Sequence, residues 1–137
     1  MPAAEPTPRR LDGVVVFAPE GFLDSRSAPP LRRAVLESID AGDTVVLLDC
    51  SSLLLIDAKA VRSLKSLDKR LRSLEGKLAL CSLTDSLQTA FRETGLDSAF
   101  QVFPHREEAL RSLRVDREFE QPPRGAEPSA YQHLRLG

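Results

Sequence analysis

The sequence contains no tryptophan, and only two cysteines and two histidines occur among its 137 residues. This shortage of ligands, with no close Cys/His spacing, argues against a zinc site and against a disulfide framework. Cys50 and Cys81 each end an apolar run, which is typical of small buried side chains in a reducing compartment. We therefore expect no metal and no cofactor.

The sequence also lacks a long apolar run and a net charge of either sign. No run approaches the roughly 20 residues that cross a bilayer, and the opening MPAAEPTPRR has no apolar stretch like that of a signal peptide. We expect a cytoplasmic protein. The 19 basic and 20 acidic residues give a formal charge of -1, which argues against a nucleic-acid partner held by overall phosphate attraction.

Proline marks the ends of the chain. Six of the ten prolines fall within residues 2–8 and 122–128, where periodic apolar residues are scarce. We expect disordered tails over residues 1–10 and 117–137. The folded unit is then one domain over residues 11–116, a common size for a single core.

Apolar patterning within this unit alternates between strand and helix. The order is ββαβαβαβα, with strands at 14–17, 21–24, 45–49, 78–81 and 100–103 and helices at 27–41, 57–75, 86–94 and 107–115. A hydroxyl cap at Ser27 begins the first helix, and a further apolar run, 53–56, leads to Asp57. We expect the first two strands to form an antiparallel ribbon. The pattern predicts an α/β fold, a mixed sheet of about five strands with about four helices.

Three segments resemble a known family. They are GFLD from Gly21, VVLLDCSSLLLIDAKAV from Val45, and LALCSLTDSLQTAFRETGLD from Leu78. With the order of elements over residues 14–112, they resemble the STAS domain, and in particular the anti-sigma-factor antagonists. The resemblance implies a docking module whose partner is a kinase-like anti-sigma factor.

The resemblance fails at three consecutive positions. Antagonists of this family carry Asp-Ser-Ser-Gly where this chain has Asp57-Ala58-Lys59-Ala60, and the first serine accepts a phosphate from the kinase. Ala58 cannot accept a phosphate, so the resemblance implies an antagonist that this modification does not release. Lys59 is either a solvated lysine or a fixed positive contact to an acidic partner.

The candidate partner-binding residues are Ala58 itself and charged residues that precede and follow it in the sequence. Asp24 and Asp57 either cap turns where strands lead into helices or, as the resemblance implies, lie near the surface that meets the partner. The long helix carries a basic stripe, which is either a solvated face or a docking face for an acidic protein or anionic lipid. The candidates are Asp24, Asp57, Ala58, Lys59, Arg62, Lys65 and Lys69.

Catalytic patterns are not evident. The seven glycines are dispersed, and neither histidine lies in a recognisable nucleophile motif. Asp24, Asp49 and Asp57 suggest the acidic cluster of a receiver domain, but residues 17–19 contain no acid and residues 100–103 no lysine. We expect a non-catalytic monomer or weak dimer. The alternative function is a STAS subunit or regulator docked on the ATPase of an ABC-type lipid transporter.

Overall fold

The computed structural model describes residues 7–120 of the chain, and the side chains of residues 7–114. Residues 1–6 and 121–137, which hold most of the two expected tails, lie outside the described residues. Within the described range the strands are β1 (Arg9–Leu11), β2 (Val14–Phe17), β3 (Gly21–Leu23), β4 (Val45–Asp49), β5 (Leu53–Ile56), β6 (Lys77–Cys81) and β7 (Gln101–Phe103). The helices are α1 (Ala28–Asp40), α2 (Ala58–Ser73), α3 (Asp85–Thr94), α4 (Leu96–Ala99) and α5 (Arg106–Glu120).

The main sheet is mixed and has five strands in the order β1-β2-β4-β6-β7. Only β1 runs antiparallel to its neighbour, and the other pairs are parallel, with Val46 of β4 opposite Val15 of β2 and Leu78 of β6. Parallel neighbours need crossover connections, which α1, α2 and the α3–α4 segment provide. The predicted α/β class and mixed five-stranded sheet are confirmed.

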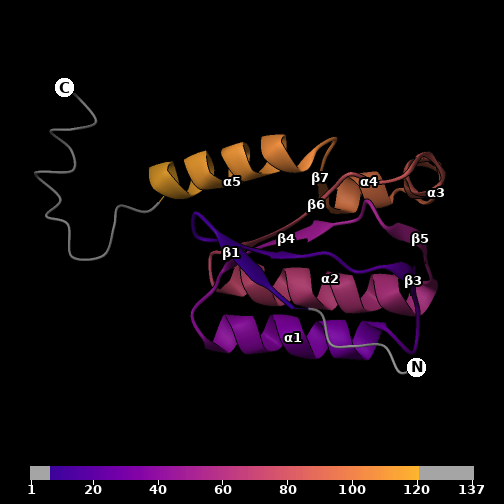
Figure 1. Ribbon diagram of the computed structural model, residues 1–137, viewed down its shortest axis with the longest axis horizontal. Helices are drawn as coiled ribbons and strands as arrows, with labels where there is room; N and C mark the ends of the chain where they lie inside the picture. Colours follow the sequence, from indigo (N-terminus) through magenta and orange to yellow (C-terminus); the bar gives the residue numbers. More distant parts are fainter. Residues whose placement is uncertain (1–6, 121–137) are drawn as a thin grey trace, which may run out of the picture.

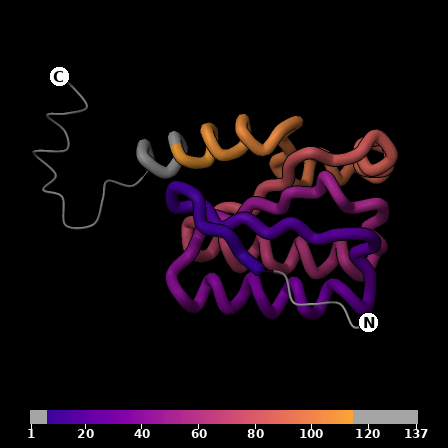
Figure 2. Tube along the Cα trace, viewed as in Figure 1, coloured from indigo at the N-terminus to yellow at the C-terminus, as the bar shows by residue number. Residues whose placement is uncertain are grey.

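Helices cover both faces of this sheet, as Figures 1 and 2 show: α1 and α2 lie against one face and α5 against the other. Successive strand residues point to opposite faces, so the central strands are apolar on both sides. Leu48 and Leu80 belong to the cluster that contains α1 and α2 residues, whereas Leu47 and Ala79 belong to the cluster packed against α5. This explains the consecutive apolar residues of β4 and β6.

A separate two-stranded sheet lies beside the main one. It consists of β3 and β5, which run parallel to each other. The expected antiparallel ribbon of residues 14–17 and 21–24 is therefore wrong. β2 instead pairs antiparallel with β1 through a tight turn at Asp12 and Gly13, whose φ angles are 54° and 83°. Positive φ at both central residues is typical of a two-residue β-hairpin.

The domain extends past both expected boundaries. Arg9 and Arg10, expected in the N-terminal tail, lie in β1, and Arg10 Nη2 forms an ion pair with Asp43 Oδ2 at 2.7 Å. At the other end, α5 continues to Glu120, past the expected boundary at residue 116. The distribution of prolines in the sequence therefore predicts the ends of the fold only to within a few residues.

Candidate docking surface

The start of α2 is fixed by Asp57. Its Oδ1 atom accepts a hydrogen bond from the backbone N–H of Ala60 at 2.8 Å, and its carbonyl accepts one from the N–H of Val61 at 2.9 Å. The Asp57 N–H donates to the carbonyl of Leu23 at 3.0 Å. Asp57 is thus the N-cap of α2, and it also ties the start of this helix to the end of β3.

Ala58 and Lys59 are the first two residues of α2, and both are exposed. Across residues 7–120, no hydrogen bond is formed by either backbone N–H, and the first turn contains no acidic residue. The positive end of the helix dipole is therefore open to solvent. A cation at Lys59 opposes this dipole by about 0.3–1 kcal/mol, so helix stability does not explain the lysine.

Asp24 organises the turn between β3 and α1. Its Oδ1 accepts hydrogen bonds from the N–H groups of Arg26 at 2.9 Å and Ser27 at 3.2 Å, and these bonds hold its pKa below the ordinary value. Ser27 occupies the N-cap position of α1, but its hydroxyl donates to the Phe22 carbonyl at 2.6 Å and makes no cap bond to the helix. The expected hydroxyl cap at Ser27 is therefore wrong, because this hydroxyl closes the turn instead.

The two turns lie side by side. Leu23 is paired with Ile56, and the bond from Asp57 N–H reaches Leu23, the residue directly before Asp24. The fold thereby brings Asp24, at the end of β3, next to the first turn of α2. Loops far apart in the sequence meet at one edge of the small sheet.

The basic residues of α2 extend from this point along its solvent side. The buried side of the helix consists of Ala60, Leu64, Leu67 and Leu71. Arg62, Lys65 and Lys69 are exposed, and within the described part of the chain they form no ion pair, whereas Arg72 Nε pairs with Asp68 Oδ2 at 3.0 Å. At 1.5 Å per residue, Lys65 lies about 10 Å along the axis from Ala58, and Lys69 about 16 Å.

We use the name docking surface for the seven residues predicted from the sequence to bind a partner: Asp24, Asp57, Ala58, Lys59, Arg62, Lys65 and Lys69. The structure brings the first four together at the α2 N-terminus and spreads the other three along the helix. Both carboxylates accept backbone hydrogen bonds, whereas the four cations have no carboxylate partner among residues 7–114. The free charge of the surface is therefore positive.

Sequence reasoning missed an apolar component beside this surface. Phe22, Leu54 and Leu55, on the two strands of the small sheet, are 57%, 63% and 48% exposed. The sequence identifies residues 53–56 only as an apolar run, and nothing in its composition distinguishes the leucines that point outward. Pairing of β5 with β3 decides which of them do.

Asp49 does not join Asp24 and Asp57 in a metal site. Its Oδ1 accepts from the N–H of Ser51 at 3.0 Å, and its Oδ2 lies 3.2 Å from Arg106 Nε at the start of α5. Among the described residues, no group of three His, Cys, Asp or Glu side chains could hold a metal ion. The acidic-cluster interpretation therefore has no geometric support.

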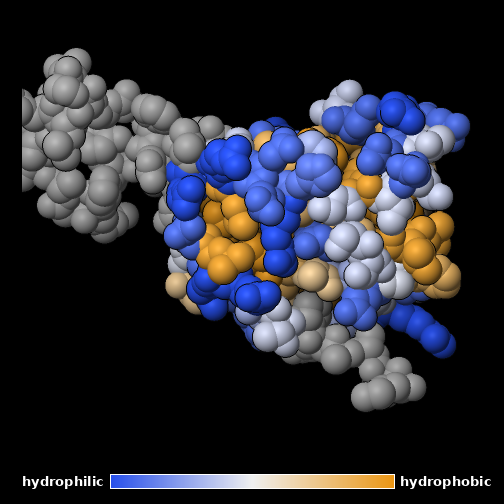
Figure 3. Space-filling view, turned by 45° about the horizontal axis from the view of Figure 1, so that its top comes forward, coloured by the Kyte–Doolittle hydropathy of each residue, from blue (hydrophilic) through white to orange (hydrophobic). Residues whose placement is uncertain are grey.

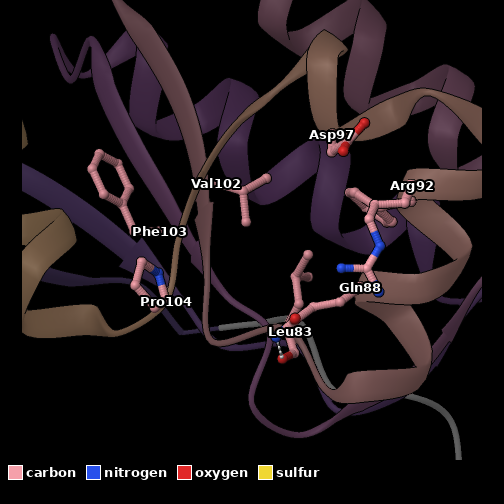
Figure 4. Close-up of a pocket in the computed structure, with 8 residues that line it drawn as sticks. Leu83, Gln88, Arg92, Asp97, Val102, Phe103 and Pro104 are labelled. Carbon is pink, nitrogen blue, oxygen red and sulfur yellow. Dashed lines mark hydrogen bonds between the residues drawn. The ribbon is translucent and has the colours of Figure 1, made fainter.

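A hollow of about 260 Å³ lies elsewhere, between α3, α4 and β7 (Figure 4). Its walls are mainly apolar, and Gln88 Nε2 donates to the carbonyl of Leu83 at 3.0 Å. Its lining residues are Leu83, Gln88, Phe91, Arg92, Asp97, Val102, Phe103 and Pro104, which include no serine, cysteine or histidine. This lining offers no nucleophile with a base, so the hollow does not resemble an active site.

None of the helices within residues 7–120 combines the length and the apolar character needed to span a bilayer. Cys50 and Cys81 are buried, and they form no disulfide. Burial raises the pKa of both thiols, which keeps them protonated.

Comparison with known proteins agrees with this architecture. A Bordetella bronchiseptica protein, "Putative anti-sigma factor antagonist BtrV", is 29% identical over 106 residues, which cover 77% of this chain and 91% of that protein. The crystal structure of a "putative anti-sigma factor antagonist" from Thermotoga maritima has the same fold, with a TM-score of 0.74 and 22% identity over 80% of this chain and 94% of that one. A sulfate transporter family protein from Wolinella succinogenes has a TM-score of 0.66 and 24% identity over 75% of this chain and 86% of that one. Residues 5–109 match the STAS domain, and the chain therefore belongs to the STAS domain family.

Proposed function

We propose that this chain is a non-catalytic docking module of a bacterial partner-switching pathway, of the anti-sigma-factor antagonist type. Its partner is a kinase-like anti-sigma factor, which binds the docking surface. The observation that carries the proposal is an exposed Ala58 at the first position of α2, on a helix terminus built like a phosphate site but without a hydroxyl. The name of the Bordetella relative supports the same class of protein.

Phosphorylation would act strongly at this point if a hydroxyl were present. A phosphate adds almost two negative charges, and the open N–H groups of a helix terminus can bind it. Such a group would reverse the charge of the docking surface near Lys59. Because Ala58 carries a methyl group, the surface stays positive and the partner is not released by this route.

The charges of the docking surface favour an acidic partner. The carboxylates of Asp24 and Asp57 are engaged by backbone N–H groups, whereas Lys59, Arg62 and Lys65 point their charges into solvent. Exposed cations of this kind raise the association rate with an acidic surface and lose this effect at high salt. The chain is cytoplasmic and monomeric or weakly dimeric in this proposal.

The test uses the full chain and the kinase-like anti-sigma factor encoded nearest to it. Calorimetry should show a complex whose affinity is the same with and without ATP, and mass spectrometry should find no phosphate on residues 57–60. Phosphate on the exposed Ser51 or Ser52 would replace the proposal of a permanent antagonist with a different switch. Absence of binding would contradict the proposed partner.

A second candidate is a STAS subunit or regulator docked on the ATPase of an ABC-type lipid transporter. The shared fold with a sulfate transporter family protein shows that transport-related chains use this architecture. Co-purification distinguishes the two: recovery of a transporter ATPase in place of an anti-sigma factor, abolished by Lys59→Glu, would favour the second candidate.

A further inference from the structure

A bulge in β5 exposes two consecutive leucines. Gly21 of β3 is opposite Leu53, but the next residue, Phe22, is opposite Leu55, so Leu54 is an extra residue in the pairing. Side chains of a regular strand alternate between faces, and one would expect only one of two neighbouring leucines to point outward. Bulges re-aim side chains in this way, often beside functional sites.

The three exposed side chains form one patch, which we call the apolar triad: Phe22, Leu54 and Leu55. Phe22 and Leu55 are register partners, so their side chains share the outer face of the small sheet. Beneath them, Leu23 and Leu53 are buried, which fixes the backbone of both strands. Figure 3 shows hydrophobic surface at the right-hand end of the molecule, the end where Figure 1 places β3 and β5.

The apolar triad is continuous with the docking surface. Leu55 lies two residues before Asp57, and Phe22 two residues before Asp24. The hydrogen bond from Asp57 N–H to the Leu23 carbonyl joins the ends of both strands at the first turn of α2. An apolar patch therefore borders Lys59 and the charged turns, an arrangement typical of an interface with an apolar centre and a polar rim.

We propose that the apolar triad is the anchor through which the partner is held, and that Lys59 and Arg62 meet acidic side chains around the partner's own apolar group. This inference rests on the proposed function and adds the chemistry of the partner's binding site: an apolar cluster with an acidic border. Desolvation of apolar side chains supplies most of the affinity in such interfaces, and rim charges mainly set the association rate.

Charge favours this partner over a second copy of the chain. A twofold interface centred on the apolar triad would place the same patch of both copies face to face. Both copies would then bring Lys59 and Arg62 to the border of one interface, and these cations have no carboxylate partner among residues 7–114. An acidic border on a different protein removes this repulsion.

The experiment measures binding of the kinase-like anti-sigma factor to the full chain and to matched variants. Leu54→Ser and Phe22→Ser each remove one anchor from a different strand, so a folding defect in one variant does not affect the other. Leu74→Ser is the control, because Leu74 is 45% exposed and ends α2 about 24 Å along the helix from Ala58. Lys59→Gln tests the proposed contact between Lys59 and the acidic border of the partner.

We expect each triad variant to weaken binding by about tenfold or more, mainly through faster dissociation, and Leu74→Ser to leave it unchanged. Lys59→Gln should slow association and flatten its salt dependence. If the wild-type chain binds and the triad variants bind equally well, the anchor is refuted while the proposed function stands. If the wild-type chain does not bind, both are refuted. Micromolar self-association by sedimentation, abolished in Leu54→Ser, would assign the triad to a second copy and refute the partner.

Discussion

Replacing Ala58 by aspartate should stabilise the chain and weaken its complex. Ala58 is exposed at the first position of α2, beside backbone N–H groups that have no partner within residues 7–120. An acid in the first turn gains about 0.3–1 kcal/mol from the helix dipole. At about 4 °C per kcal/mol for a domain of this size, the melting temperature should rise by roughly 1–4 °C.

The same charge should oppose the partner. It would lie beside Lys59, inside the docking surface, and face the acidic border that we propose. A like-charge contact of this kind costs about 2 kcal/mol or more, and 2 kcal/mol is about a 30-fold rise in Kd. The two effects have opposite signs, so a variant that merely damages the fold cannot produce both.

Differential scanning calorimetry and titration calorimetry measure the two effects, and Ala58→Asn is the matched control because asparagine has the shape of aspartate without its charge. Binding should fall in Ala58→Asp and stay near the wild-type value in Ala58→Asn. An equal loss in both variants would mean that size, not charge, controls the site. Unchanged binding in both would place the interface elsewhere and refute the reasoning.

Three further predictions concern the scaffold of the surface. Gly76→Ala should lower the free energy of unfolding in urea by about 1–3 kcal/mol, because an added Cβ would overlap the backbone carbonyl of Thr44. A urea midpoint equal to that of the wild type would contradict this prediction. Asp24→Asn should lower the free energy of unfolding at pH 7, because only the carboxylate form of Asp24 is stabilised by the backbone N–H groups of its turn. This difference from the wild type should vanish as the pH falls below about 4 and through the lowered pKa of Asp24. Urea midpoints at both pH values measure the difference, and a difference that does not change with pH would contradict the prediction. Cys50 and Cys81 should resist iodoacetamide in the native chain and react in urea, because burial raises the pKa of both thiols. Mass spectrometry detects the alkylation, and rapid alkylation of the native chain would show that the thiols are accessible.

The four longer helices and the parallel strands of the main sheet could be predicted because their signals are local, whereas the short α4 was not predicted. α2 begins after Asp57 and keeps its apolar residues at helical spacing, and α3 ends at Gly95, whose φ of 77° suits glycine. β4 and β6 are short apolar runs buried on both faces. Each of these elements carries its own start, end and burial pattern in the sequence.

Strand pairing was predicted less well, because it depends on residues far apart in the chain. β1 contains two arginines at the end of a proline-rich segment, so its composition does not indicate a strand. The pair Asp12-Gly13 is a hairpin signal that identifies the β1–β2 turn in retrospect. β5 was recognised as an apolar run, but the bulge that exposes Leu54 exists only once β3 lies beside it.

Part of the candidate site could likewise be predicted from local sequence, and part depends on strand pairing. The positions of Asp57, Ala58 and Lys59 at the start of a helix follow from the sequence, because the cap and the apolar spacing predict them. The closeness of Asp24 to this helix follows from the hydrogen bond between Asp57 and Leu23, which no periodicity reveals. The basic residues of α2 were visible as a stripe, whereas the apolar triad required the structure.

The separation of the small sheet from the five-stranded sheet bears on how related chains can diverge. Phe22, Leu54 and Leu55 point away from both hydrophobic clusters, so substitutions at these positions change the outer face without creating cavities in the core. Duplicated genes can therefore alter these three positions with little loss of folding stability. Paralogues in one cell could acquire distinct partners, and avoid crosstalk, through changes confined to two short strands.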